Sequence, residues 1–168
     1  MSRLYPLRRA WATPGLLRAT LFCLPLIDEF VSGIPVLTLP LARADLHFGY
    51  AQVGLIFTIA ELSGLLVDPA VSAASDHWSK PRLVLGAMLG LALGFALAGS
   101  SPTFSWLLLA FVVIGATNGI AVGIGPSILI DQAPEAAQST VTRLVFLATI
   151  GDILGPLLVA GTIALHGS

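Results

Sequence analysis

Residues 104–128 read FSWLLLAFVVIGATNGIAVGIGPSI, a stretch without a single Asp, Glu, Lys or Arg. A helix needs roughly 20 mostly apolar residues to cross the hydrocarbon core of a bilayer. This stretch reaches that length. Ser101, Pro102 and Thr103 precede it, and a polar, turn-forming break follows from Asp131 to Ser139. We therefore interpret residues 104–128 as a membrane-spanning helix and look for similar stretches on either side of it.

Four further apolar stretches of this kind occur, at residues 17–41, 50–74, 83–98 and 141–165, and residues 83–98 form the shortest of them. The connections between them are short and rich in charged residues, Gly, Ser or Pro, as expected of loops. The pattern predicts an all-α protein, a polytopic membrane helix bundle with about five transmembrane helices. Residues 1–16 are then an N-terminal segment, and residues 17–165 form the membrane domain.

The composition supports a membrane protein and excludes several other classes. Hydrophobic residues make up 56% of the chain and charged residues only 10%, whereas about a quarter of the residues in soluble domains are charged. A net charge of −1 gives no basic face for nucleic acid. Cys23 is the single cysteine, so neither a disulfide nor a zinc-type cluster is expected. No phosphate-binding loop or catalytic motif appears, so we expect no enzyme, metal or cofactor.

Basic residues indicate the orientation of the chain in the membrane. Those flanking one side of the predicted spans are Arg3, Arg8, Arg9, Arg18, Lys80, Arg82 and Arg143, and the other side has Arg43. Loops rich in Lys and Arg stay in the cytoplasm, so we expect the N-terminus to be cytoplasmic. We expect the protein to lie in the cell (cytoplasmic or inner) membrane. A cleaved signal peptide is the less favoured interpretation of the first span, since Asp28 and Glu29 interrupt its apolar run.

Carboxyl groups within the predicted spans are the main functional candidates. They are Asp28 and Glu29 in the first span, Glu61 and Asp68 in the second, and Asp152 in the fifth. An ionisable group at mid-membrane depth is unfavourable by about 2.5–3.5 kcal/mol on insertion scales. Such residues therefore commonly bind substrate or relay protons, although a carboxyl can also bond a neighbouring helix or line a wet vestibule. Asn118 in the fourth span also needs a polar partner.

Glycines at four-residue spacing predict close packing between the spans. Gly115, Gly119 and Gly123 follow this spacing in the fourth span, and Gly151 and Gly155 follow it in the fifth. Small residues let helix backbones approach closely in lipid. The spacing indicates a tight bundle and does not by itself indicate a function.

The order of these features resembles the first five helices of a major facilitator superfamily transporter. Asp28 followed by GIPVLTLPLARADLHFGYAQVGLIFT (residues 33–58) is similar to the acid-bearing first helix of that family, its proline-rich exit and the short loop into the second helix. GDILGPLLVAG, residues 151–161, is similar to the Gly-x-x-x-Gly-Pro motif of antiporters, with Gly151, Gly155 and Pro156 in place. The resemblance implies a fold of two six-helix halves around a central cavity.

The loop SAASDHWSKPRLVLG, residues 72–86, stands where the family carries its cytoplasmic G-x-x-x-D-R-x-G-R-R motif. Asp76 and Lys80 match that motif, and the positions of its glycines hold serine. The resemblance implies a charge-relay latch that helps to govern the switch between inward-open and outward-open states. We therefore group Asp68, Asp76, Lys80 and Arg82 as candidates for a conformational-switch loop.

The sequence thus predicts part of a secondary transporter for a small solute, as a half or truncated form, with proton-coupled efflux as one mode. Its expected partners are the lipid bilayer, an unknown small-molecule substrate, protons, and a second copy of the chain or a partner transporter half. The alternative is a truncated or non-transporting membrane protein that assists or regulates a full transporter.

Overall fold

The computed structural model describes residues 15–75 and 77–166. Within these residues the chain forms α2 (Gly15–Asp45), α3 (Tyr50–Ser75), α4 (Lys80–Gly99), α5 (Phe104–Gln132), the short 3-10 helix η1 (Pro134–Ala136) and α6 (Ala137–His166). The described part holds five helices that are long and apolar enough to cross a membrane. This finding confirms the predicted all-α class, and each predicted span lies within one of the long helices.

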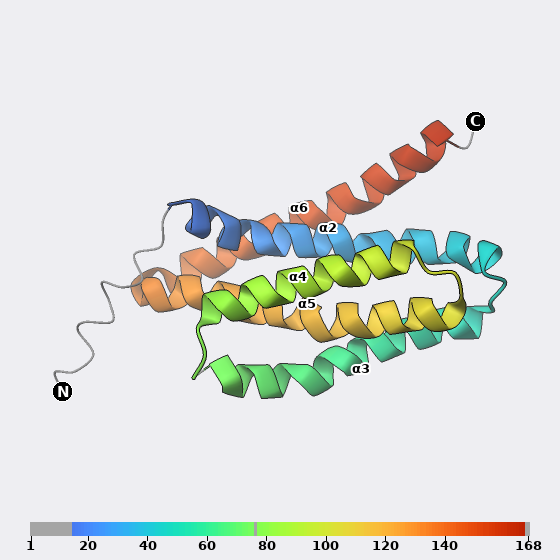
Figure 1. Cartoon of the computed structure of the whole chain (residues 1–168). Coiled ribbons are helices and arrows are strands. Elements are labelled where there is room, and N and C mark those ends of the chain that lie inside the picture. The colour runs from blue at the N-terminus through green and yellow to red at the C-terminus, as the bar shows by residue number, and fades with distance from the viewer. Residues whose placement is uncertain (1–14, 76, 167–168) are drawn as a thin grey trace.

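The long helices run alternately in opposite directions along one bundle axis (Figure 1). The α3–α4 and α5–α6 connections therefore lie at the end of the bundle where α2 begins, and the α2–α3 and α4–α5 connections lie at the other end. Two local features shape the connections after α2 and before α5. His47 has a φ of 54°, in the left-handed region, just after α2 ends. Thr103 caps α5 by accepting a hydrogen bond from the Trp106 N–H.

Helix α5 is the centre of the bundle. It packs extensively against α3 and α4 and also contacts α2, while α6 packs mainly against α2 (Figure 1). α5 can contact several neighbours because it is apolar around its whole circumference, as expected for a helix surrounded by other helices and lipid. The result is a layer of α3, α5 and α4, with α2 connecting that layer to α6.

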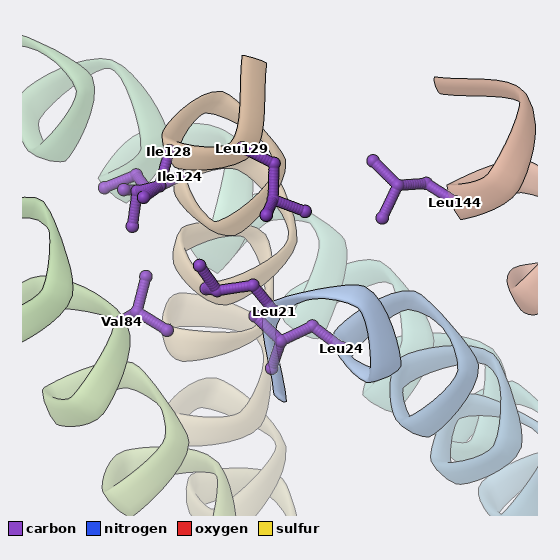
Figure 2. Close-up of a cluster of buried hydrophobic side chains, with 7 residues drawn as sticks. All are labelled: Leu21, Leu24, Val84, Ile124, Ile128, Leu129 and Leu144. Atoms are coloured by element: carbon purple, nitrogen blue, oxygen red, sulfur yellow. The ribbon is translucent and has the colours of Figure 1, made fainter. Parts of the chain in front are cut away.

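Two clusters of buried apolar side chains hold the bundle together, one towards each end. The first consists of Leu21, Leu24, Val84, Ile124, Ile128, Leu129 and Leu144, and Figure 2 shows how α2, α4, α5 and α6 each contribute to it. The second consists of Leu39, Phe48, Ile56, Leu91, Leu107, Phe111 and Ile114. The Phe48 ring, in the α2–α3 loop, packs at a tilt against Phe104, with ring centroids 5.4 Å apart. The loop is thereby fixed to the start of α5.

Glycines allow direct backbone contact at two helix crossings. A Cβ on Gly115 of α5 would overlap the backbone of Ala60 on α3. A Cβ on Gly151 or Gly155 of α6 would likewise overlap α2, at the backbone oxygen of Leu26 or Phe30. α3 therefore sits directly on α5, and α6 sits directly on α2, without intervening side chains.

We expect Gly115→Ala to destabilise the protein by about 1–3 kcal/mol, because the added methyl group forces α3 away from α5. Gly123→Ala, on the same helix, is the matched control, since nothing lies within 4 Å of a Cβ built there. Thermal unfolding in detergent, followed by circular dichroism, measures both variants. Equal midpoints for the two variants would show that backbone contact at Gly115 does not hold α3 in place.

Candidate functional site

The structure brings three of the predicted carboxyl groups together. Asp28 and Glu29 are neighbours on α2, and the Glu29 carboxyl lies close to that of Asp152 on α6. The packing of α6 on α2 creates this proximity, because Gly151 lies directly against the α2 backbone and a Cβ on it would be 3.1 Å from the Glu29 Cβ. Glu29 is half-buried, whereas Asp152 is exposed.

Asp28 points to a different neighbour. Consecutive residues on a helix point about 100° apart, and the Asp28 carboxyl lies close to the Asn118 side chain on α5. Its Oδ1 atom is buried and makes no hydrogen bond within the described residues. Asn118, which is a candidate from its position in the sequence, therefore lies beside the cluster formed by Asp28, Glu29 and Asp152. We call these four residues the carboxyl site.

Glu61 is not part of this site. It is exposed on α3, and α3 packs on α5 and makes only slight contact with α2. The charged neighbours of Glu29 are Asp152 and Asp28, and Glu61 is not among them. The seven-residue spacing of Glu61 and Asp68 places them on one face of α3. Only the packing of the helices shows that Glu61 is separated from α6, because α3 and α6 make no substantial contact within the described residues.

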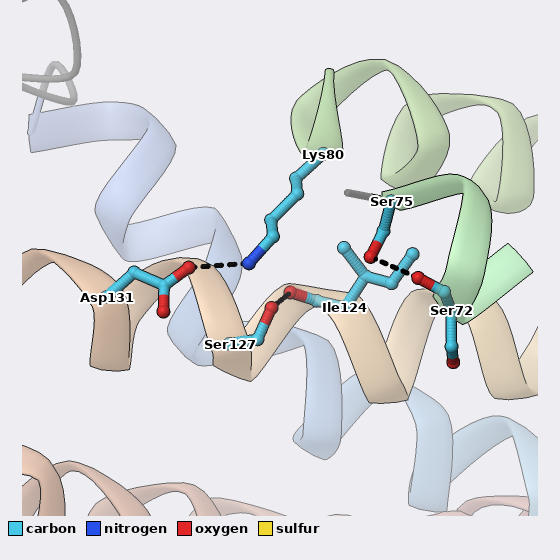
Figure 3. A network of polar contacts seen from close by, with 6 residues as sticks. All are labelled: Ser72, Ser75, Lys80, Ile124, Ser127 and Asp131. Atoms are coloured by element: carbon cyan, nitrogen blue, oxygen red, sulfur yellow. Dashed lines mark hydrogen bonds and ion pairs between the residues drawn. The ribbon is translucent and has the colours of Figure 1, made fainter. Parts of the chain in front are cut away.

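A second polar region lies at the end of the bundle where α4 begins. Lys80, at the start of α4, donates a hydrogen bond to Oδ2 of Asp131 near the end of α5, at 2.5 Å (Figure 3). This is an ion pair between a predicted switch residue and a residue that the sequence does not single out. In the sequence, Asp131 follows the predicted span and is interpreted as part of a loop. Helix α5 continues to Gln132, and so Asp131 faces Lys80.

Asp68 lies deeper in the same region. Its carboxyl rests on the α5 backbone at Gly119, where a Cβ would overlap it, and its Oδ1 atom is buried without a hydrogen-bond partner in the described chain. A cavity of about 290 Å³ adjoins it, and the side chains of Ser72, Ser75, Lys80 and Ser127 also line this cavity. The Ser75 hydroxyl donates to the Ser72 carbonyl oxygen, and the Ser127 hydroxyl donates to that of Ile124 (Figure 3).

The remaining switch candidates are placed differently. Asp76 lies outside the described residues. Arg82 lines a separate groove with His77 and Trp78. The predicted switch group is thus divided between two places, with Asp68 and Lys80 at one cavity and Arg82 at another. No group of three or more His, Cys, Asp or Glu residues in the described ranges is arranged to hold a metal ion.

The fold and these sites define an integral membrane protein built from spanning helices, with carboxyl groups between helices at membrane depth. Residues 21–168 match the sequence profile of the Major Facilitator Superfamily. The chain belongs to this family of membrane transporters, which confirms the resemblance seen in the first five spans. The family indicates a transporter and not an enzyme.

Three curated relatives support this assignment. The chain is 26% identical over 128 residues to the uncharacterized MFS-type transporter YtbD of Bacillus subtilis (strain 168), covering 76% of this chain and 32% of that protein. It is 26% identical over 132 residues to the efflux pump azaK of Aspergillus niger, covering 79% and 28%. It is 25% identical over 112 residues to a D-xylose transporter of Levilactobacillus brevis, covering 67% and 24%.

The chain thus spans between about a quarter and a third of the length of the curated relatives it matches. A comparison with solved structures gave no significant match.

Proposed function

We propose that this chain forms part of the transport pathway of a secondary transporter for a small solute, and that the carboxyl site contacts the solute or the coupling proton. The observation that carries the proposal is the meeting of Asp28, Glu29 and Asp152 from α2 and α6 with Asn118 from α5. Side chains from helices far apart in sequence converge here at membrane depth. Carboxyl groups placed this way are unfavourable unless they serve transport or are neutralised.

The proposal includes coupling of transport to protons. Two carboxyl groups can share a hydrogen bond only when one of them holds a proton, because carboxylates have no donor. Glu29 and Asp152 lie close together, so each can accept a proton that the other releases. Efflux of a cationic solute follows naturally from this chemistry, since a cation and a proton then compete for the same carboxyl group. One relative is named as an efflux pump.

We expect Asp28→Asn and Glu29→Gln each to lower flux by at least about tenfold, the equivalent of about 1.4 kcal/mol. The assay uses the purified chain in proteoliposomes with an imposed pH gradient, and ethidium and D-xylose as probes. Asp45→Asn is the matched control, because Asp45 is an exposed carboxyl at the end of α2, away from the carboxyl site. Full flux in the double variant, with normal incorporation, would exclude the carboxyl site from transport.

We further propose that the N-terminus is cytoplasmic, from the excess of basic residues on that side. In a Cys23→Ala background, an impermeant maleimide applied to intact bacterial cells should label Ser100→Cys but not His77→Cys. Both positions are exposed and lie at opposite ends of the bundle. Labelling of His77→Cys and not of Ser100→Cys in intact cells would contradict this orientation.

We also propose that a parallel set of helices covers the face of α6 that carries Asp152. The exposed Asp152 carboxyl supports this, because lipid is a poor environment for it. A second copy of the chain or a partner transporter half would supply the cover, and a two-fold axis along the membrane normal permits either arrangement.

A cysteine at Val145, seven residues before Asp152 and so on the same face of α6, should therefore form disulfide-linked dimers in a Cys23→Ala background. Leu89→Cys on α4 is the matched control, since Val145 and Leu89 are 59% and 64% exposed. α4 packs against α5 and has no substantial contact with α6. Dimers that form equally at both positions, or at neither, would count against the covered α6 face.

A further inference from the structure

A groove separates α3 from α4 at the end of the bundle where α4 begins. Both helices pack closely on α5, but in the described residues they make little or no contact with each other. The groove has a volume of about 630 Å³. Its lining residues are Val71 of α3, His77, Trp78 and Ser79 of the connection, Arg82, Leu83, Gly86 and Ala87 of α4, and Thr117 and Ile120 of α5. It is separate from the carboxyl site and adjoins the Asp68 cavity, with which it shares Val71 and Ile120.

The chemistry of the groove changes along its length. At the end near the α3–α4 connection it carries His77, Trp78 and Arg82, all of them exposed. Further along α4 and on α5 the lining is mainly apolar and small, with Gly86 and Ala87. Nothing lies within 4 Å of a Cβ built on Gly86, so the groove is open over that residue. A polar mouth followed by an apolar slot between two spanning helices fits a molecule with a polar head and a hydrocarbon chain.

The described residues at the mouth carry a positive charge. Among the described residues Arg82 has no ion-pair partner, and none of the residues lining the groove is acidic. Lys80 does not supply this charge, because it is paired with Asp131. A guanidinium group binds phosphate oxygens through two parallel hydrogen bonds. An exposed tryptophan next to it is typical of the level of the lipid headgroups.

We propose that this groove binds a membrane phospholipid with an anionic headgroup. Its phosphate contacts the Arg82 guanidinium, and one acyl chain lies over Gly86, in the slot between α3 and α4. A lipid fits better than a soluble phosphate ester, because the slot is apolar and both of its walls are spanning helices. The lipid would also fill space between α3 and α4 that protein side chains leave open.

Trp78 reports on this site directly, because it lines the groove. The variant Trp11→Phe, Trp106→Phe keeps Trp78 as the single tryptophan. We would reconstitute it into phosphatidylcholine vesicles and replace part of the lipid by phosphatidylglycerol or phosphatidylcholine with brominated acyl chains, which quench tryptophan on contact. We expect phosphatidylglycerol to be preferred at Trp78 by about fivefold, the effect of about 1 kcal/mol per basic residue at an anionic lipid.

Two variants with matched controls separate this site from general attraction to the membrane. Arg82→Gln should abolish the preference, and Arg143→Gln should keep it, because Arg143 is an exposed cation on α6, away from the groove. Gly86→Phe should fill the slot and reduce quenching by both brominated lipids. Gly99→Phe should not, although nothing lies within 4 Å of a Cβ on Gly99 either. Circular dichroism checks that each variant is folded.

Equal quenching by the two lipids in the parent protein would overturn the proposal. So would a preference that survives Arg82→Gln, or quenching that is unchanged in folded Gly86→Phe. Competition by inorganic phosphate, added at millimolar concentration, would show that the mouth takes a soluble anion and would also overturn it.

Discussion

Backbone contact at glycine is the constraint on which the arrangement of these helices depends. Between spanning helices the hydrophobic effect gives little guidance, because lipid is as apolar as the side chains, and close packing sets the positions instead. Gly115 holds α3 on α5, and Gly151 and Gly155 hold α6 on α2. The second crossing also fixes the polar chemistry, because it sets the height and rotation of α6 at which Asp152 meets Glu29.

The polar groups fall into regions with different surroundings. The carboxyl site lies between spanning helices, where water is scarce and a carboxyl group must share a proton, find an amide or contact a solute. The Lys80–Asp131 pair lies at the end of the bundle, with side chains that are 29% and 62% exposed. An exposed ion pair stabilises a fold by only about 0–1 kcal/mol, so it can break and re-form easily.

Asp68 connects the end region with the interior of the bundle. It shares a cavity with Lys80, yet its carboxyl rests on the backbone of α5 at Gly119. Movement of α3 along α5 would therefore change the surroundings of Asp68 and Lys80 together. The groove between α3 and α4 lies beside this contact, since Val71 and Ile120 line both the groove and the cavity.

The sequence by itself determined the class, the number of spans and the residues worth testing, because span length, charge-free runs and carboxyl groups at membrane depth are local properties. It also pointed to the family, through the order of Asp28, the Asp76–Lys80 loop and Gly151-x-x-x-Gly155-Pro156. Only the tertiary structure decided which candidates meet. A helix such as α5 is apolar all round, so its pattern does not indicate which face a neighbour covers. The rotation and crossing of the helices separate Glu61 from the carboxyl site. They also place Arg82 and Lys80 at different pockets and pair Lys80 with Asp131.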